Sequence, residues 1–281
     1  MSLSPELLIR LAAFFAVFTA MALWELFAPR RPLGVRRAAR WPSNLGVLVV
    51  DAVAVRLLVP TAAVGVALIA AAHGFGLFHV LGVPFWIAAL AGFLVLDLVI
   101  YGQHVVFHHV PWLWRLHRMH HADVDIDVST GGRFHPIEIL LSMLIKMATV
   151  ALVGIPAGAV IAFEVVLNAS SMFNHSNVGM PVWLDRVMRL VVVTPDMHRV
   201  HHSVLRQETD SNFGFNLPWW DRLFGTYRAE PRAGHDGMTI GLPIFRDPGE
   251  LRLDRLLTQP FRAPADVGVT TPGPAIDGPP S

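Results

Sequence analysis

Eight histidines of this chain fall into three short groups whose spacing suits metal binding. His104 and His108 stand four residues apart. The other two groups repeat one pattern, a histidine followed by two more at three and four residues beyond it: His117, His120 and His121, then His198, His201 and His202. Residues three and four apart lie on one face of a helix. Each group therefore points its imidazoles in a common direction, as a helix-borne metal site requires.

Eight imidazoles are too many for one ion and suit two, each with three or four ligands and open coordination positions. His175, in FNHSN, is a further candidate ligand, and His135, in RFHP, is a candidate without an assigned role. His109 adjoins the first group but points about 100° away from its shared face, so we exclude it. Three others have no patterned neighbour and are left out: His73, His79 and His235.

The composition restricts both the metal and the class of protein. The chain has 281 residues, no cysteine, 53% hydrophobic residues and only 15% charged ones, whereas a soluble domain usually has about 25% charged residues. Without cysteine, disulfides, thiolate zinc sites, iron–sulfur clusters and thiolate-bound haem are excluded. The zinc-hydrolase motif HExxH is also absent. Imidazole-rich sites suit Zn, Cu, Fe and Ni alike, so ligand type alone does not select the metal.

Long apolar blocks must position the histidines. Three blocks are long enough to span a bilayer, which takes about 20 apolar residues as a helix: 7–27, 45–72 and 83–101. The link RRPLGVRRAAR (30–40) holds five of the 22 basic residues, and the positive-inside rule places it in the cytoplasm. The third block then delivers the histidines to the cytoplasmic face.

A fourth apolar region, 136–173, is interrupted by Gly-Ile-Pro at 154–156, which favours a turn. The two arms predict a helical hairpin that enters and leaves by the same face, so histidines before and after it can meet. Lys146 and Glu164 each lie nine residues from Ile155. A hairpin puts them at equal depth, where pairing lowers the cost of a buried charge; alternatively, each snorkels or faces a cavity on its own.

We therefore predict an all-α fold, an integral membrane helical bundle with a cytoplasmic histidine-rich helical cap. Residues 1–82 would hold the N-terminal membrane helices and the basic link, 83–228 the di-metal domain, and 229–281 a C-terminal extension. The stretch VWLDRVMRLVVV (182–193) is amphipathic and suits the membrane interface. The tail 260–281 is rich in Pro and Gly and is predicted to be disordered.

Asp97 and Tyr101 extend the stripe of His104 and His108, with spacings of four, three and four residues. Carboxylates commonly accept the second N–H of a ligand histidine, so a layer of supporting side chains is expected behind the ligands. An ion pair with Arg56 is the alternative role for Asp97. The candidates for the supporting layer are Asp97, Tyr101, His135 and Asp196.

Five segments resemble the fatty acid hydroxylase / sterol desaturase superfamily: HVVFHHVPWLWRLHRMHH (104–121), RFHPIE (133–138), FNHSNV (173–178), MHRVHHS (197–203) and NFGFNLPWWDRLFGTY (212–227). That family shows HX3H, HX2HH and a second HX2HH in this order, and the likeness runs from about residue 90 to 228. The resemblance implies a non-haem di-iron oxygenase in which the eight patterned histidines are ligands and His175 is an additional one. His109 stands where many members carry Arg or Glu, which leaves the substrate open.

The resemblance implies hydroxylation or desaturation of an unactivated C–H of a lipid, such as a sterol, a fatty acyl chain or a sphingoid base. O2 would react at two Fe ions, which zinc can replace in a purified sample. No flavin or nicotinamide fingerprint occurs, so electrons would come from an external ferredoxin-, cytochrome- or reductase-like donor. Three arginines beside the histidines could steer an acidic donor: Arg115, Arg118 and Arg199. Alternatively, they hold anionic lipid headgroups or carboxylates that support the ligands.

The expected location is a bacterial-type inner membrane with the metal site on the cytoplasmic side, and no nucleic-acid partner is expected. Two other functions fit a histidine-rich membrane protein: metal binding or transport, and hydrolysis by a zinc pair. A transporter should place its ligands near the membrane midplane, whereas these histidines lie at the ends of apolar blocks.

Overall fold

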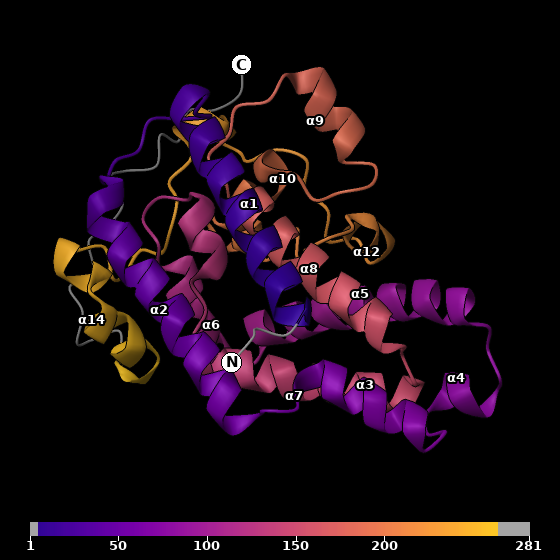
Figure 1. Cartoon of the computed structure of the whole chain (residues 1–281). Coiled ribbons are helices and arrows are strands. Elements are labelled where there is room, and N and C mark those ends of the chain that lie inside the picture. The colour runs from indigo at the N-terminus through magenta and orange to yellow at the C-terminus, as the bar shows by residue number, and fades with distance from the viewer. Residues whose placement is uncertain (1–4, 264–281) are drawn as a thin grey trace.

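The described part of the chain folds into helices joined by loops (Figure 1). The computed structural model describes residues 5–263. The longer helices are α1 (Pro5–Phe27), α2 (Arg37–Leu58), α3 (Ala62–Ala72), α5 (Phe85–His109), α6 (Pro111–His121), α7 (Pro136–Val153) and α8 (Ala157–Asn174). The shorter elements are α4 (Leu77–Val80), η1 (Val128–Gly132), α9 (Val182–Met188), α10 (Pro195–His201), α11 (Arg206–Thr209), α12 (Trp219–Leu223), α13 (Gly234–Gly237), η2 (Pro248–Leu251), α14 (Leu253–Thr258) and η3 (Gln259–Phe261). The predicted all-α class is confirmed.

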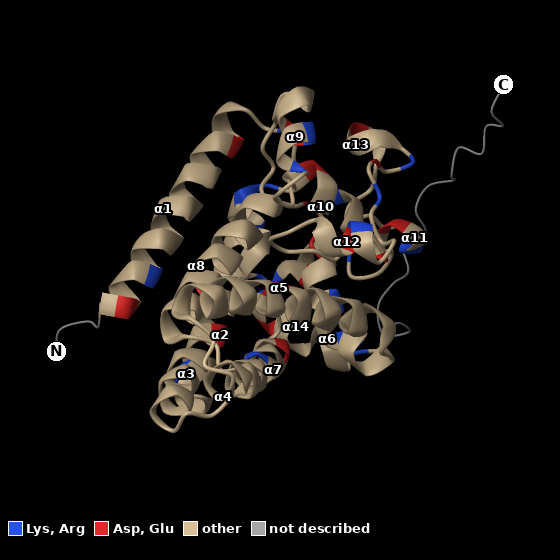
Figure 2. Ribbon diagram, turned by 90° about the vertical axis from the view of Figure 1, so that its right-hand side faces the viewer, with Lys and Arg blue, Asp and Glu red and all other residues tan. Residues whose placement is uncertain are grey.

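Five helical segments are long and apolar enough to cross a membrane: α1, the run from α2 to α4, α5, α7 and α8. Their surfaces expose large apolar side chains such as Phe15, Trp86 and Leu152, which lipid tolerates and water does not. Each of the short helices α9 to α13 contains charged residues, whereas α3 and α4 contain no Lys, Arg, Asp or Glu (Figure 2). The protein is therefore an integral membrane helical bundle.

The predicted block 45–72 lies within one candidate membrane span, Arg37–Val80, but it is not one continuous helix. The helix is interrupted around Pro60, since α2 ends at Leu58 and α3 begins at Ala62. Proline has no N–H to donate and clashes with the preceding turn, so it interrupts a helix even in an apolar run. The first of these helices also begins earlier than predicted, at Arg37 inside the basic link. By contrast, α5 continues two turns beyond the predicted block and so carries the first histidine group.

The predicted helical hairpin is present as α7 and α8. Gly154 ends α7 in the left-handed conformation, with φ 77°, which glycine adopts without a Cβ clash. Lys146 Nζ donates to Glu164 Oε1 at 2.5 Å, which confirms the predicted pair, and Arg10 of α1 donates to the other oxygen at 2.6 Å. This triad joins three helices at one depth.

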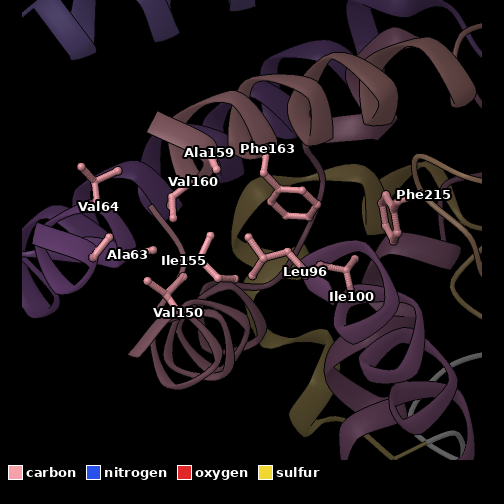
Figure 3. Close-up of a cluster of buried hydrophobic side chains, with 11 residues drawn as sticks. Ala63, Val64, Leu96, Ile100, Val150, Ile155, Ala159, Val160, Phe163 and Phe215 are labelled. Atoms are coloured by element: carbon pink, nitrogen blue, oxygen red, sulfur yellow. The ribbon is translucent and has the colours of Figure 1, made fainter. Parts of the chain in front are cut away.

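The main apolar core lies where α3, α5, α7 and α8 meet (Figure 3). Ile155, in the hairpin turn, and Phe163 of α8 are fully buried in it beside Leu96 of α5. Phe215 belongs to the same cluster, and its ring centroid lies 5.1 Å from that of His104. The core therefore extends directly to the first histidine group.

The C-terminal extension packs against α6 and α2 as far as the description reaches. Prediction of a disordered tail from residue 260 is wrong for its first residues, because Pro260 and Phe261 belong to η3. Arg115 donates to the carbonyl oxygen of Pro260, and Arg118 to that of Gln259. The rest of the predicted tail, 264–281, lies outside the described residues. Both arginines therefore fasten the C-terminal extension to α6; Arg118 is buried, whereas Arg115 stays exposed.

Candidate metal centre

All nine histidines predicted as ligands are buried, and they gather into two neighbouring groups. We call them the five-histidine group and the four-histidine group. Within each group, one potential ligand atom of every member lies within 4.8 Å of all the others. The first consists of His104, His108, His117, His121 and His201, and the second of His120, His175, His198 and His202.

Four helices bring these side chains together from distant parts of the chain. Helix α5 supplies two histidines to the five-histidine group, and the end of α8 supplies His175 to the other. Helices α6 and α10 each start with a proline in the first turn, Pro111 and Pro195, where its fixed φ favours a helix start. The two HX2HH motifs lie at the C-terminal ends of these short helices, so both face the same interior.

Backbone carbonyls fix the ring orientation of four histidines. Each Nδ1 lies within hydrogen-bond distance of one carbonyl oxygen: His104 with Phe213 at 2.7 Å, His201 with Ser211 at 2.7 Å, His175 with Ser171 at 2.7 Å and His120 with Arg133 at 3.2 Å. A carbonyl can only accept, so Nδ1 carries the proton in each ring. In a neutral imidazole the other nitrogen, Nε2, is then a bare acceptor.

Two carboxylates fix the ring orientation of two further members of the five-histidine group. His117 Nδ1 donates to Glu138 at 2.6 Å, and His108 Nδ1 donates to Asp210 at 3.2 Å. Such outer partners set the tautomer and raise the basicity of a ligand histidine. Neither was predicted from the sequence, although Glu138 lies within RFHPIE, at the first turn of α7.

The inward-facing nitrogens create a problem that a cation resolves. Nε2 of His104 lies 3.0 Å from Nε2 of His117, and Nε2 of His120 lies 3.0 Å from Nε2 of His175. Because all four are acceptors, each contact sets one lone pair against another. Three further rings have inward nitrogens that are buried without a partner: His108, His201 and His202. Buried unsatisfied polar atoms are costly, so the donor set fits two metal ions held by imidazole.

Burial also keeps the imidazoles neutral. It lowers the pKa of His175 to about 4. Burial, reinforced by the neighbouring imidazoles, lowers the pKa of His120, His198 and His202 well below the ordinary value. Metal binding requires the deprotonated ring, so near neutral pH these side chains are already in the ligand form.

A buried ionic network supports the segment between α6 and α7. Arg40 donates to Asp123 at 2.7 Å and to Asp127 at 2.6 Å, and all three side chains are inaccessible to solvent or nearly so. Burial opposes ionisation, but Arg40 and Arg133 together hold the pKa of Asp123 well below its usual value. The same segment presents the Arg133 carbonyl to His120, so the network supports the segment that orients this ring.

Gly131 lets this segment approach α8 closely. A Cβ at Gly131 would lie 2.6 Å from the carbonyl oxygen of Ser171, far inside van der Waals contact. The Ser171 side chain donates back to the Gly131 carbonyl at 2.8 Å. Because the Ser171 carbonyl orients His175, glycine at 131 is required for the two segments to support the four-histidine group together.

The residues predicted to lie behind the ligands have other contacts in the structure. Asp97 accepts from Trp220 Nε1 at 2.8 Å and does not pair with Arg56, and Tyr101 bonds to Thr226 at 2.9 Å. Both therefore fasten the 212–227 segment to α5, and this segment carries the Phe213 carbonyl that orients His104. Their predicted support of the metal site would act through that segment.

Two other predicted residues and one excluded histidine lie outside the two histidine groups. His135 caps α7, where its Nδ1 accepts from the Ile137 amide at 3.2 Å. Asp196 forms ion pairs with Arg30 and Arg199, so Arg199 too is engaged internally rather than available to a donor. His109 bonds to the carbonyl of Val105 in its own helix. None of the three joins either histidine group.

A cavity of about 520 Å³ reaches the five-histidine group. His104 and His117 form part of its wall, together with apolar side chains of α2, α5, α7 and α8 such as Leu48, Ile100 and Met143. Pockets for small ligands commonly have about 300–1,000 Å³ and mostly apolar walls. The cavity is thus suited to an apolar chain that ends beside the histidines.

Comparison with known proteins yields one family and several lipid-modifying relatives. Ornithine lipid hydroxylase OlsE of Rhizobium tropici is 31% identical over 56% of this chain and 46% of that protein. Alkylglycerol monooxygenase of Homo sapiens is 31% identical over 55% of this chain and 34% of its own. Cholesterol 25-hydroxylase of Homo sapiens is 28% identical over 48% of this chain and 49% of its own. The chain thus spans a third to a half of the length of these relatives.

No match was found among solved structures. The family model described as fatty acid hydroxylase covers residues 89–226, a range that includes every member of the two histidine groups. These findings agree with the resemblance carried by the three histidine motifs, and residues 89–226 of the chain belong to the fatty acid hydroxylase family.

Proposed function

We propose that this protein is a membrane-bound non-haem di-iron oxygenase that hydroxylates an unactivated C–H of a lipid, using O2 and electrons from an external donor. The observation that carries the proposal is the pair of neighbouring buried histidine groups, of which the five-histidine group borders a mainly apolar cavity. The names of the relatives, an ornithine lipid hydroxylase, an alkylglycerol monooxygenase and a cholesterol 25-hydroxylase, support a lipid substrate.

The two histidine groups would each hold one iron ion, and bound iron would supply the O2 activation that attack on an unactivated C–H requires. The protein's own contribution is positional. Outer carbonyls and carboxylates hold the imidazoles with Nε2 facing inward. The cavity wall excludes water and directs an apolar chain toward His104 and His117. Because residues 5–263 contain no cysteine to hold an iron–sulfur cluster, an electron-transfer partner is part of the proposal.

We also propose a cytoplasmic position for the metal groups, in a bacterial-type inner membrane. The five arginines between Arg30 and Arg40 support this orientation through the positive-inside rule. Val178, in the segment that follows α8, forms a bridge with Pro29 just before these arginines. The basic link and the histidine-bearing end of α8 are therefore on the same side of the bundle.

Metal analysis and O2 uptake test the proposal together. Protein purified without chelators is expected to contain two iron ions per chain and to consume O2 only when both a reductant and a lipid extract are present. Removal of the metal by a chelator should stop O2 uptake, and added Fe²⁺ should restore it. Stoichiometric zinc with lipid hydrolysis under anaerobic conditions would instead establish a hydrolase. Metal transport into vesicles without O2 uptake would establish a transporter.

Replacing Glu138 with glutamine is expected to weaken metal binding at the five-histidine group. Glutamine keeps the shape and an acceptor but removes the charge that stabilises the proton on His117 Nδ1. Loss of such an outer partner typically lowers metal affinity or activity by about 10–100-fold. Competition with a chelator measures the affinity directly.

Glu230→Gln is the matched control, because Glu230 has a side chain that is 66% exposed and lies outside both histidine groups. It should leave chelator competition unchanged. If Glu138→Gln binds metal as tightly as the wild type does, the carboxylate does not act through His117.

A further inference from the structure

The cavity that reaches His104 and His117 is also lined by charged side chains. Four of them neutralise one another: Lys146 and Arg10 both donate to Glu164, and Arg10 also donates to Glu6. A fifth, Glu138, is bonded to His117. Two ionisable side chains, one acidic and one basic, remain without a hydrogen-bond or ion-pair partner within residues 5–263, and both belong to α2.

Asp51 is the first of these two side chains. It is only 5% exposed, and its Oδ1 is buried with no hydrogen-bond partner. No side chain or amide in residues 5–263 donates to its carboxylate. A buried carboxylate without a donor is costly, and an ionisable residue in a membrane-spanning helix commonly marks a functional site. Because Asp51 lines the cavity, a ligand there can supply the missing donor.

Arg56 is the second. It lines the same cavity five residues further along α2, which corresponds to about 7.5 Å along the helix axis. Its side chain forms no hydrogen bond or ion pair with any residue in the described range. An acidic and a basic side chain without an internal partner in residues 5–263 therefore both line this cavity, on positions of α2 that lie about 140° apart around the helix.

A second acceptor lies nearer the histidines. Gln103 precedes the ligand His104 and lines the cavity, and its Oε1 is buried without a partner. Ammonium groups carry three N–H donors, so one ammonium can serve more than one acceptor. The wall is thus complementary to a group that combines several N–H donors with a nearby negative charge.

We propose that the cavity selects a zwitterionic lipid, whose ammonium binds Asp51 and whose anionic group binds Arg56, while the apolar chain extends toward His104 and His117. This inference rests on the proposed function for the chemistry at the metal, but the binding itself does not need the metal. Both selecting residues lie before residue 89, where the family match begins. Substrate choice would therefore be determined by a part of the chain outside that match.

Lipid binding by the full-length protein in detergent tests the proposal. Three lipids with identical oleoyl chains serve as probes: phosphatidylethanolamine, which is zwitterionic, phosphatidylglycerol, which has only the anionic group, and diacylglycerol, which is neutral. Native mass spectrometry ranks their affinities. The wild type is expected to bind the zwitterionic lipid at least about tenfold more tightly than either of the others, since hydrogen bonds to charged groups contribute about 1.5–3 kcal/mol.

Two substitutions that remove a charge separate the contributions. Asp51→Asn should lose about tenfold in affinity for phosphatidylethanolamine only. Arg56→Gln should weaken both phospholipids and leave diacylglycerol unchanged. Neither change removes an internal bond, and Arg56 is exposed, so the second variant tests the idea even if the first does not fold. Unchanged affinities in Arg56→Gln, or in a folded Asp51→Asn, would overturn the proposal.

Asp247→Asn and Arg36→Gln are matched controls on exposed residues outside the cavity, and they should leave all affinities unchanged. Bound metal should be equal in every variant. If the protein consumes no O2 but still binds the zwitterionic lipid most tightly, the proposed oxygenase activity is refuted and the proposed headgroup selection is supported. If it consumes O2 but binds the three lipids equally, the oxygenase proposal is supported and headgroup selection is refuted.

Discussion

His120→Ala is expected to abolish lipid-dependent O2 uptake and to lower the metal content from two ions per chain to about one. His120 belongs to the four-histidine group, where its Nε2 lies 3.0 Å from that of His175. Its loss leaves three imidazoles for that ion, whereas the five-histidine group keeps all its members. Hydroxylation that depends on both ions would stop even though one remains. Metal analysis by mass spectrometry and O2 uptake with reductant and lipid give the two readings.

His235→Ala is the control for this prediction. His235 is also buried, but its nearest carboxylates are Glu230 and Asp196, and it belongs to neither histidine group. It should retain both metal and O2 uptake. Equal tolerance of the two substitutions would remove the basis for a metal site in the four-histidine group. Loss of both ions in His120→Ala would show that the groups form one cooperative site.

The sequence predicted which histidines gather, because the i, i+3, i+4 pattern is a local property of a helix. It did not predict how they divide between the two groups. On α6, His117 and His121 are four residues apart and join the same group, whereas His120 lies about 100° around the helix from His121 and joins the other. On α10 the pattern is reversed, since His198 and His202 share the four-histidine group and His201 joins the first. Only the packing of the helices determines this interleaving.

The supporting contacts could not be predicted in the same way. Most of the groups that orient the rings are backbone carbonyls, such as those of Phe213 and Arg133, and a carbonyl leaves no signature in a sequence. The stripe from Asp97 through Tyr101 to the histidines is present on α5, but these two side chains bond to the 212–227 segment instead. Predicting correctly which residues share a face of α5 therefore did not predict which segment packs against that face.

The membrane helices could be predicted where the length and hydropathy of an apolar block determine the helix. They were harder to predict where a single residue interrupts the block. Pro60 breaks the second block because a missing N–H outweighs the surrounding apolar side chains. At the other end, composition suggested disorder from residue 260, yet Arg115 and Arg118 hold the carbonyls of that region against α6. Such long-range contacts, separated by about 140 positions in sequence, are beyond a local reading.

Arg40→Met is expected to cause the largest loss of stability, about 3–5 kcal/mol in the free energy of unfolding. Arg40 is fully buried and joins Asp123 and Asp127, both also buried. Removing one partner of a buried ion pair leaves uncompensated charge, which is the costly case. Denaturation in detergent, followed by tryptophan fluorescence, measures the change. Arg36→Met, on an exposed side chain without a partner, should stay within about 0.5 kcal/mol of the wild type.

A second substitution separates charge from packing. If the penalty comes from the stranded carboxylates, Arg40→Met combined with Asp123→Asn should recover part of the lost stability, because one of the two charges is then absent. If packing is responsible, the double variant should be no more stable than the single one.

Metal content distinguishes this network from the ligands themselves. His120→Ala removes metal from a folded protein, whereas Arg40→Met should lose metal only as it unfolds, since its effect reaches His120 through the segment that carries Arg133. Metal loss from a fully folded Arg40→Met protein would mean that the network orients the ligand directly, independently of its contribution to folding.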